Sequence, residues 1–282
     1  MPRRTGPLPP EVRALLPVVR DWRASRCPLG VDDKVLCAWN GLMIEALCEL
    51  YRATGEERYL SAAKRAQAFL DARLRVGTQL FVSFRAGKRG VRANLSDYAA
   101  EVSALLALWG ATLEPRYLDL AEALVDRAAE RFFDEENGGF YLYDRESEEL
   151  LLRPKESEDG ALPGGNSLML RALLALQALR PSEVRERVLE KQLDWQSARA
   201  RLDPMGHAAF LAALSDRLEP PPKVTVAVGD RAELGELPFL LPPEAALVIV
   251  DPPTAEYPLL EGKTAYYVCR GNTCLPPVTE LR

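Results

Sequence analysis

Residues 46–63 read ALCELYRATGEERYLSAA, and residues 104–121 read ALLALWGATLEPRYLDLA, so one pattern returns after 58 residues. In both copies apolar residues recur at the i, i+3, i+4 spacing of an amphipathic helix, which ends near Thr54 or Thr112. A short turn follows, and a second helix opens with the same Arg-Tyr-Leu triplet. The repeat therefore predicts a series of helix hairpins.

A third copy of the first helix extends this series, because NSLMLRALLALQAL at 166–179 aligns with NGLMIEALCELYRA at 40–53. Helix pairs repeated at roughly 50–70 residues stack either as an open solenoid or as a closed α/α toroid. The segments at 78–95 and 140–154 each predict a short β-hairpin between helices. Long hairpin insertions at one end of each helix pair suit a toroid that carries its functional loops on one face.

The periodicity places eight helices, at 10–24, 39–53, 56–74, 96–111, 114–133, 166–179, 182–201 and 204–217. A closed toroid of six hairpins contains twelve helices, so the expected fold is mainly α: a partial (α/α)6 toroid of helix hairpins with short β-hairpin insertions. Three consecutive prolines, Pro220 to Pro222, mark the end of the helical domain, which is predicted to span 1–219. The β-branched runs after them predict a small C-terminal sheet, in a β-rich appendage at 220–282 that packs on the helices.

Composition narrows the classes of partner. The 282 residues carry a net charge of −5, with 48% apolar and 27% charged residues, which is ordinary for a globular protein. The acidic balance gives no electrostatic reason to expect nucleic acid or anionic lipid as a partner. No apolar run approaches the ~18 residues that span a bilayer, and no apolar segment follows the basic N-terminus, so no signal peptide is expected. We therefore expect a cytoplasmic protein with no membrane contact.

Cysteine and histidine are too few for most metal or nucleophilic chemistry. The chain has five Cys and a single His, His207, and no cluster supplies four closely spaced zinc ligands. No metal or cofactor is expected, and His207, in the first turn of a predicted helix, is expected to be structural or to face solvent. Cys269 and Cys274 have a C-x4-C spacing. They are either two small residues at the end of a strand and turn, or a redox or structural disulfide.

Three segments of unusual composition each enter the first helix of a repeat: VDDKVLCAWNGL at 31–42, NLSDYAAE at 94–101 and PKESEDGALPGGNSL at 154–168. The inner helices of an α/α toroid run parallel, so all three segments are expected to meet at one mouth. Helix N-termini there also present free N–H groups and the positive end of the helix dipole.

Two of these segments share a spacing that suits carbohydrate chemistry. Asp33 lies seven residues before Asn40, and Asp159 lies seven before Asn166. Two carboxylates delivered to one cavity from related positions are what glycoside chemistry needs, one as acid and one as base. The predicted catalytic residues are Asp33, Asp159 and, as a third candidate, Asp97. The predicted substrate-binding residues are Trp39 and Tyr98, which stack on sugar rings, and Asn40, Lys155 and Asn166, which bind hydroxyls.

Structural roles compete with each of these assignments. Asp97 and Asn166 stand where helix caps are common, Asp33 belongs to a charged cluster with Asp32 and Lys34, and Trp39 suits a core position. The competing hypothesis is a non-catalytic scaffold that binds a protein or a sugar without turning it over. Carboxyl groups roughly 5–10 Å apart across an open cavity favour hydrolysis, whereas carboxyl groups that cap helices favour the scaffold.

The motif DDKVLCAWNGLMIEAL resembles the D-D-K-x-L-x-x-W-N-G-L-M segment of the thioredoxin-domain-containing family typified by spermatogenesis-associated protein 20. The resemblance continues through LSDYA, FFDEENGGFY, RPKESEDGALPGGNS and TAYYVCRGNTCLPPVT, from about residue 10 to the end. It implies an N-terminal thioredoxin-like domain followed by a toroid of the six-hairpin glycosidase type, a class that also includes N-acylglucosamine 2-epimerases. The fold and a carbohydrate connection are thus implied, without a particular reaction.

The chain departs from this family pattern in three respects. The thioredoxin-like domain and the first half of the toroid are absent from it. Gly164 stands where the family usually has Ser, and Ser96 stands where it usually has an acid, which weakens a catalytic pair at Asp97. The epimerases rely on His residues at the cavity, and the one His here lies outside the motif segments, so an epimerase is not expected.

The count of helices leads to an expectation about partners. An open arc of hairpins leaves apolar flanks where neighbouring hairpins pack in a closed toroid. We therefore expect either a separate polypeptide that carries the thioredoxin domain and the first half of the toroid, or a homo-oligomer that covers the open edges.

Overall fold

The computed structural model describes residues 6–26, 30–147, 152–242, 244–271 and 273–281. The chain divides into two compact units, Met1–Lys34 and Val35–Arg282. In the first unit, helix α1 (Pro10–Arg26) has no buried residue. The boundary predicted at 219/220 lies within the second unit, between its last long helix and its sheet.

All eight predicted helices are present. Those of the second unit are α2 (Cys37–Thr54), α3 (Glu57–Arg73), α4 (Leu95–Thr112), α5 (Pro115–Phe132), α6 (Gly165–Leu179), α7 (Glu183–Ala200) and α8 (Ala208–Leu218), with a short α9 (Leu237–Leu240) and two 3₁₀ turns, η1 (Met205–His207) and η2 (Arg231–Glu236). The repeat extends to the helix ends, because the residue after α2, Gly55, and the equivalent residue after α4, Leu113, both adopt the left-handed conformation. No described helix is long and apolar enough to cross a membrane.

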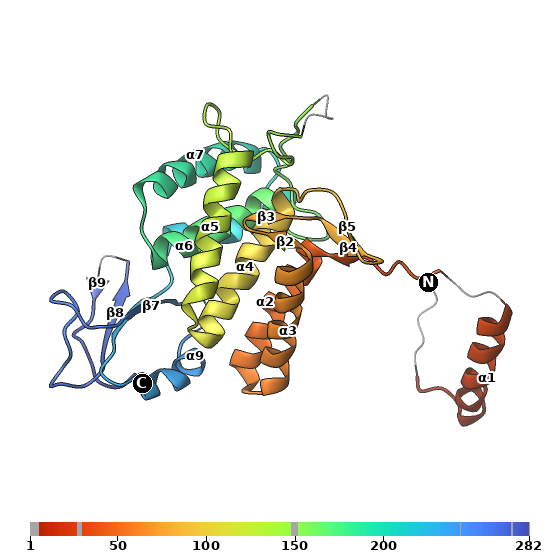
Figure 1. Ribbon diagram of the computed structural model, residues 1–282, viewed down its shortest axis with the longest axis horizontal. Helices are drawn as coiled ribbons and strands as arrows, with labels where there is room; N and C mark the ends of the chain where they lie inside the picture. Colours follow the sequence, from red (N-terminus) through yellow and green to blue (C-terminus); the bar gives the residue numbers. More distant parts are fainter. Residues whose placement is uncertain (1–5, 27–29, 148–151, 243, 272, 282) are drawn as a thin grey trace. The chain divides into compact units, whose positions relative to one another are not determined.

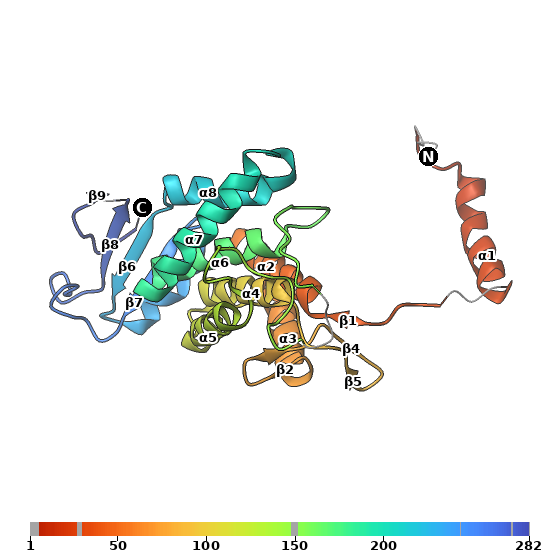
Figure 2. The same cartoon turned by 90° about the horizontal axis from the view of Figure 1, so that it is seen from above.

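The helices of the second unit form two layers, as a partial α/α toroid does. The inner layer is a row in which α2 packs on α4, α4 on α6 and α6 on α8. The outer helices α3, α5 and α7 each pack on the inner helix that precedes them in the chain (Figures 1 and 2). The first inner pair is so close that a Cβ on Gly41 would lie 2.7 Å from the carbonyl oxygen of Ala100. A glycine is therefore required where α2 crosses α4.

The main core lies between these two layers. Helix α4 has inner neighbours on both sides, and it contributes more than half of its residues to the interior, including Leu95, Tyr98, Leu105 and Leu108. Its sequence is accordingly apolar around most of its circumference, as expected for a helix buried by neighbours on several sides.

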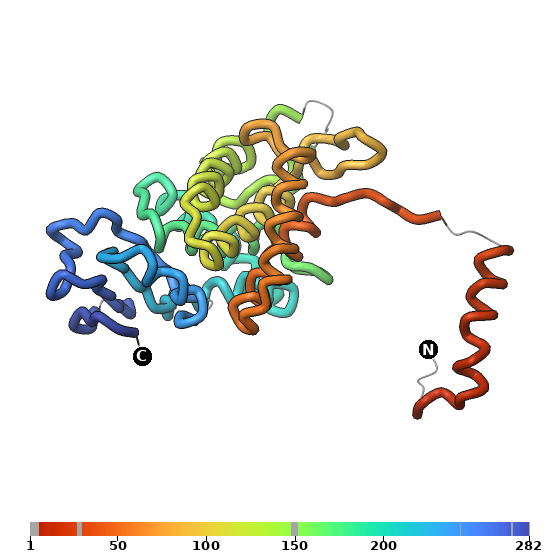
Figure 3. The backbone as a smooth tube through the Cα atoms, turned by 60° about the horizontal axis from the view of Figure 1, so that its bottom comes forward, coloured from red at the N-terminus to blue at the C-terminus, as the bar shows by residue number. Residues whose placement is uncertain are grey.

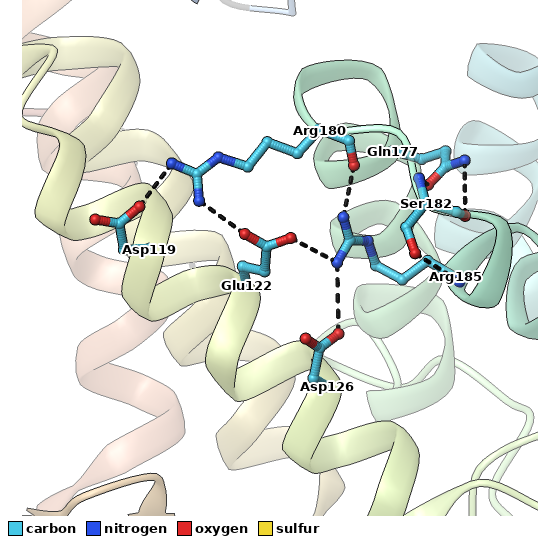
Figure 4. A network of polar contacts seen from close by, with 7 residues as sticks. All are labelled: Asp119, Glu122, Asp126, Gln177, Arg180, Ser182 and Arg185. Atoms are coloured by element: carbon cyan, nitrogen blue, oxygen red, sulfur yellow. Dashed lines mark hydrogen bonds and ion pairs between the residues drawn. The ribbon is translucent and has the colours of Figure 1, made fainter.

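A polar network ties the second hairpin to the third on the outside of the molecule (Figure 4). Arg180, which follows α6, donates to Asp119 at 2.6 Å and to Glu122 at 2.7 Å, both on α5. Arg185 on α7 donates to Glu122 at 2.8 Å and to the carbonyl oxygen of Arg180 at 2.6 Å. Because Glu122 accepts from both guanidinium groups, it fixes the turn between α6 and α7 against α5.

Short strands fill the connections between hairpins. The predicted hairpin at 78–95 forms strands β3 (Gln79–Leu80), β4 (Ser83–Arg85) and β5 (Lys88–Arg89), which pair with β1 (Val35–Leu36) and β2 (Arg75–Val76) in the orders β1-β4-β5 and β2-β3. The turn of the hairpin predicted at 140–154 falls on residues 148–151, outside the described residues. Beside it no strand is assigned in the described part, although the Leu142 N–H donates to the carbonyl oxygen of Pro154 at 2.8 Å.

The predicted C-terminal sheet is present. Its strands are β6 (Lys223–Ala227), β7 (Ala246–Val250), β8 (Ala265–Arg270) and β9 (Thr273–Cys274), in the order β7-β6-β8-β9. Strands β6 and β7 are parallel, and the other pairs are antiparallel. Figure 3 shows these residues gathered beside the helices. A second apolar cluster, which includes Val226 and Leu247, lies within this part.

Arg52 joins the sheet region to the helices. It extends from the end of α2 and donates to the carbonyl oxygens of Pro238 at 3.0 Å and of Leu241 at 3.2 Å. The rings of Tyr51 and Phe239 make an edge contact beside it, with centroids 5.1 Å apart. The sheet is thus anchored at the C-terminal ends of the inner helices, the opposite end from the motif segments.

Candidate functional site

The N-termini of the inner helices meet at one end of the arc, as the repeat predicts. The Ala38 N–H in the first turn of α2 donates to Asp97 Oδ1, at the start of α4, over 3.1 Å. A Cβ on Gly165, the first residue of α6, would lie 2.8 Å from Ser96 Oγ. The Ala209 N–H in the first turn of α8 donates to Asp159 Oδ2 over 2.8 Å. The second and third motif segments and the start of α2 therefore form a common mouth.

Asp97 satisfies the N-termini of two helices at once. In its own helix it forms a capping box with Asn94, in which the Asn94 N–H donates to Asp97 Oδ2 at 3.0 Å. Its other oxygen accepts from Ala38 of the neighbouring helix. The side chain is buried, and burial raises the pKa of Asp97 to about 6 against the opposing effect of these backbone hydrogen bonds. Both carboxylate oxygens are thus engaged by the protein itself.

Asp159 has the corresponding role on the other side of the mouth. One carboxylate oxygen accepts from the Gly164 N–H, just before α6, and the other from the Ala209 N–H of α8, both at 2.8 Å. Its own N–H donates to the carbonyl oxygen of Gly206 at 2.6 Å. Asp159 therefore closes the loop that enters α6 and fastens it to the first turn of α8.

Asp33 belongs to the first unit, where its side chain is exposed. Lys34 beside it forms an exposed ion pair with Asp32, with an N–O separation of 3.2 Å. A pairing of Asp33 with Asp159 stays a prediction, because these residues lie in different units.

The predicted aromatic residues differ in accessibility. Trp39, in the first turn of α2, is 63% exposed and is available to a ligand or a partner. Tyr98 is 1% exposed, donates its hydroxyl to the carbonyl oxygen of Thr78 at 3.0 Å, and packs on Phe132. Tyr98 is therefore a core residue of the central inner helix.

The predicted hydrogen-bonding side chains, Asn166, Asn40 and Lys155, all donate to backbone carbonyl oxygens. Asn166 is buried; its amide donates to the carbonyl oxygens of Phe140 and Glu156 at 3.0 and 2.8 Å. Asn40 donates to the carbonyl oxygen of Leu36 at 2.8 Å. Lys155 Nζ contacts Asp134 Oδ2 at 2.6 Å and the carbonyl oxygen of Gly138 at 2.7 Å.

These contacts shape the loop at 134–139. Burial by itself raises the pKa of Asp134, but the hydrogen bonds from Lys155 and Asn137 hold this pKa well below its usual range. Gly138 and Gly139 both have positive φ, and a Cβ on Gly139 would lie 2.4 Å from the Trp195 ring. The polar residues of this motif are therefore explained by loop structure.

His207 also has a structural environment. It is buried at the N-cap position of α8, where its side chain makes no capping hydrogen bond, and its Nδ1 lies 2.7 Å from the carbonyl oxygen of Asp203. Within the described part of the chain, no group of three His, Cys, Asp or Glu side chains is placed to hold a metal ion.

One buried acidic residue, Glu101, was not predicted as a site residue from the sequence. Glu101 is completely buried on α4, and Gln67 of α3 donates to its Oε1 at 2.6 Å. Its Oε2 has no hydrogen-bond partner among the described residues. Burial raises the pKa of Glu101 to about 7, as expected for a carboxylate that is removed from water. Glu101 follows Asp97 by four residues. This is an ordinary i, i+4 spacing in a helix, so the sequence gave no indication that Glu101 is buried.

A cavity of about 700 Å³ lies between the inner helices and the C-terminal sheet. Arg171 of α6 crosses it to Glu45 of α2, with N–O distances of 2.7 and 2.9 Å, and lies 3.5 Å from Ser103 Oγ of α4. Ala107 of α4 and Lys223 of β6 are also in its wall. Its size is within the roughly 300–1,000 Å³ of small-molecule sites.

The repeat explains why these three residues meet. Glu45, Ser103 and Arg171 occupy the same position in the three copies of the inner helix. The equivalent positions four and seven residues later also line the cavity in every copy: Glu49, Ala107 and Ala175, then Arg52, Gly110 and Ala178. The i, i+4, i+7 stripe is the concave face of the arc. A charged residue at an inward position of a repeat is the signal that could have revealed this cavity.

Comparison with curated proteins identifies relatives. Spermatogenesis-associated protein 20 of Homo sapiens is 26% identical in an alignment 288 positions long, which covers 89% of this chain and 35% of that protein. The protein of the same name from Mus musculus is 32% identical in an alignment 167 positions long, which covers 55% of this chain and 21% of that protein.

The chain is similar in sequence to spermatogenesis-associated protein 20. The resemblance expected from the motifs is thus confirmed, and the chain spans about a third or less of the length of these relatives. No family model matches the sequence.

Solved structures share part of the architecture. Cellobiose 2-epimerase from Spirochaeta thermophila is 22% identical, with a TM-score of 0.49, over 65% of this chain and 51% of that one. The GH76 α-mannanase of Bacteroides thetaiotaomicron is 20% identical, with a TM-score of 0.45, over 61% of this chain and 46% of that one. Both TM-scores are below 0.5.

The buried acid predicts how stability depends on pH. Glu101 has a folded pKa of about 7, above its ordinary value of 4.5, so the folded chain holds a proton that the unfolded chain releases between these values. The free energy of unfolding should therefore fall as pH rises from 4.5 to 7, by on the order of 2–3 kcal/mol from this group. Urea unfolding at several pH values should show a flatter dependence for Glu101→Gln, which keeps the contact with Gln67. Parallel curves for both proteins would contradict the assignment.

Proposed function

We propose that the chain is a carbohydrate-binding toroid segment whose ligand occupies the cavity between the inner helices and the C-terminal sheet. The observation that carries the proposal is the set of Glu45, Ser103 and Arg171, which projects from three helices at one repeat position into the cavity. These side chains place acceptors, donors and a hydroxyl within one ligand's reach.

The charges of the cavity favour a neutral polar ligand. Its described lining includes four acidic and four basic side chains, namely Glu45, Glu49, Asp216, Glu244, Arg52, Arg171, Arg217 and Lys223. Balanced charges give no net attraction for a phosphate or a polyanion. Paired carboxylates and guanidinium groups suit vicinal hydroxyls, and the apolar wall at Leu106 and Leu174 suits the C–H face of a sugar ring.

Binding without turnover fits the carboxylates at the mouth better than hydrolysis does. Asp97 and Asp159 each accept two backbone N–H groups, and a carboxylate held in this way is a helix cap. An acid/base role for Asp33 and Asp159 is the competing hypothesis.

Calorimetric titration with a panel of neutral mono- and disaccharides tests the proposal. Arg171→Met should weaken the binding of any active sugar by about tenfold or more, since it removes a charged hydrogen-bond donor. Arg65→Met, on an exposed position of α3, is the matched control and should bind as the unchanged protein does. A panel without any binder, or equal affinities for the two variants, would overturn the proposal.

The same sugars test the competing hypothesis. Release of reducing ends from glycosides, abolished by both Asp33→Asn and Asp159→Asn at an unchanged melting temperature, would establish hydrolysis instead of binding alone.

A second candidate function, a binding subunit that completes a larger toroid, is favoured by the surface of α2. Trp39, Met43 and Leu50 are 63%, 58% and 43% exposed on this helix. We propose that a further helix hairpin, from a separate polypeptide, covers this stripe in the complete assembly. Apolar side chains grouped in this way on a surface are typical of an interface.

An uncovered stripe predicts self-association of the isolated chain. Light scattering should show a mass that rises with concentration, and Met43→Lys should restore the monomer because a charge in an apolar contact is unfavourable. Ala68→Lys, at an exposed position of α3, should leave association unchanged. A monomer at every concentration would remove the basis for a covering partner.

A further inference from the structure

Cys269 and Cys274 form a disulfide that joins the last two strands of the sheet. The two residues are direct cross-strand partners in the antiparallel pair β8–β9, and Lys223 of β6 is the partner of Cys269 on its other side. Ala246 of β7 pairs with Lys223 in turn. Cross-strand partners project from the same face of a sheet, so these four residues form one row across four strands.

This row faces the cavity. Ala246, Lys223 and Cys269 all line it, so the disulfide continues the cavity wall toward solvent. Cys274, at the edge strand, is exposed. Cys274 is therefore the residue of the pair that an external thiolate can reach, while Cys269 is the cross-strand neighbour of Lys223 in the wall of the cavity.

Two other cysteines have the opposite environment. Cys37 and Cys48 are completely buried. Burial, with the neighbouring carboxylates of Glu101 and Asp97, raises the pKa of the Cys37 thiol well above its usual value, and burial raises that of Cys48 to about 12. Thiols of this kind are poor nucleophiles, so neither competes with the exposed pair.

We propose that Cys269–Cys274 is a reversible thiol–disulfide exchange site whose reaction partner is a dithiol. A thiolate of the dithiol attacks Cys274 Sγ, and the disulfide breaks with Cys269 leaving as a thiolate. The second thiolate of the dithiol then attacks the mixed disulfide and releases Cys274. The dithiol is thereby oxidised to a disulfide, the pair is reduced to two thiols, and the two protons lost by the dithiol are the two that the cysteines gain.

Lys223 has a defined part in this exchange. Thiolates leave faster when their pKa is low, and a neighbouring cation lowers the pKa of a thiol. Since Lys223 lies beside Cys269 in the row, it stabilises the leaving thiolate. Lys223 acts on the rate of exchange as a positioning residue, through the charge that it holds next to Cys269.

Reduction should also loosen the edge of the sheet. Strand β9 has two residues, and it is paired with β8 at Cys269–Cys274 and Arg270–Thr273. The Leu275 N–H donates to the carbonyl oxygen of Val268 at 2.9 Å just beyond this pairing. Without the covalent link, the Leu275 amide should exchange its hydrogen faster, whereas amides in β6 keep their protection.

The test treats the folded protein with buffers of dithiothreitol and its oxidised form, without denaturant or sugar. Thiols are then trapped with iodoacetamide and located by peptide mapping. We expect both cysteines of the pair to be labelled in reducing buffer and protected again in oxidising buffer, with an unchanged far-UV circular dichroism spectrum. Lys223→Gln should slow reduction on the order of threefold, and Lys263→Gln, at an exposed position of the same region, should not.

Three results would overturn the proposal. The first is a pair that is reduced only when the circular dichroism signal of the folded chain is lost, which would make the disulfide structural. The second is a pair of thiols that oxidised dithiothreitol does not join. The third is an equal rate for Lys223→Gln and Lys263→Gln, which would remove the assigned role of Lys223. None of these readouts involves a sugar, so they are independent of the carbohydrate proposal.

Discussion

The N–H groups in the first turn of an α-helix have no partner within the helix, and at the mouth of this arc an adjacent repeat supplies the acceptor. Asp97, at the start of α4, accepts from the first turn of α2. Asp159, before α6, accepts from the first turn of α8. Each carboxylate thus aligns the start of one inner helix with the start of the next, and the same bonds occupy the oxygens that an acid/base catalyst would need.

Aligned helix starts have a consequence at the other end of the helices. Because the helices begin at one level, equivalent positions of the repeat lie at similar depths, and Glu45, Ser103 and Arg171 meet across the concave face. The sheet covers this face at the C-terminal ends, where Arg52 binds the carbonyl oxygens before β7. The cavity therefore results from repeat register and from the sheet together, and its wall includes the disulfide-bonded Cys269.

Periodicity and turn residues were enough to predict the helices and three of the four strands of the sheet, β6, β7 and β8, but not the short edge strand β9. They did not separate Trp39 from Tyr98, since both are aromatic residues at the start of an inner helix. Tyr98 is buried because α4 has inner neighbours on both sides, whereas Trp39 is exposed on α2. Accessibility here depends on the order of helices in the arc, which local sequence does not encode. The repeat alignment places Glu45, Ser103 and Arg171 at equivalent positions, but the sheet that closes the cavity over them depends on tertiary packing that the repeat does not encode.

The free energy of unfolding of Asp159→Ala, compared with Asp194→Ala at an exposed position of α7, tests the central claim that the mouth carboxylates hold the inner helices together. Loss of an N-terminal cap costs about 1–2 kcal/mol, and an exposed substitution usually changes stability by less than about 0.5 kcal/mol. We expect Asp159→Ala to be destabilised by the larger amount. Equal stabilities for the two variants would contradict the claim and return Asp159 to the catalytic candidates.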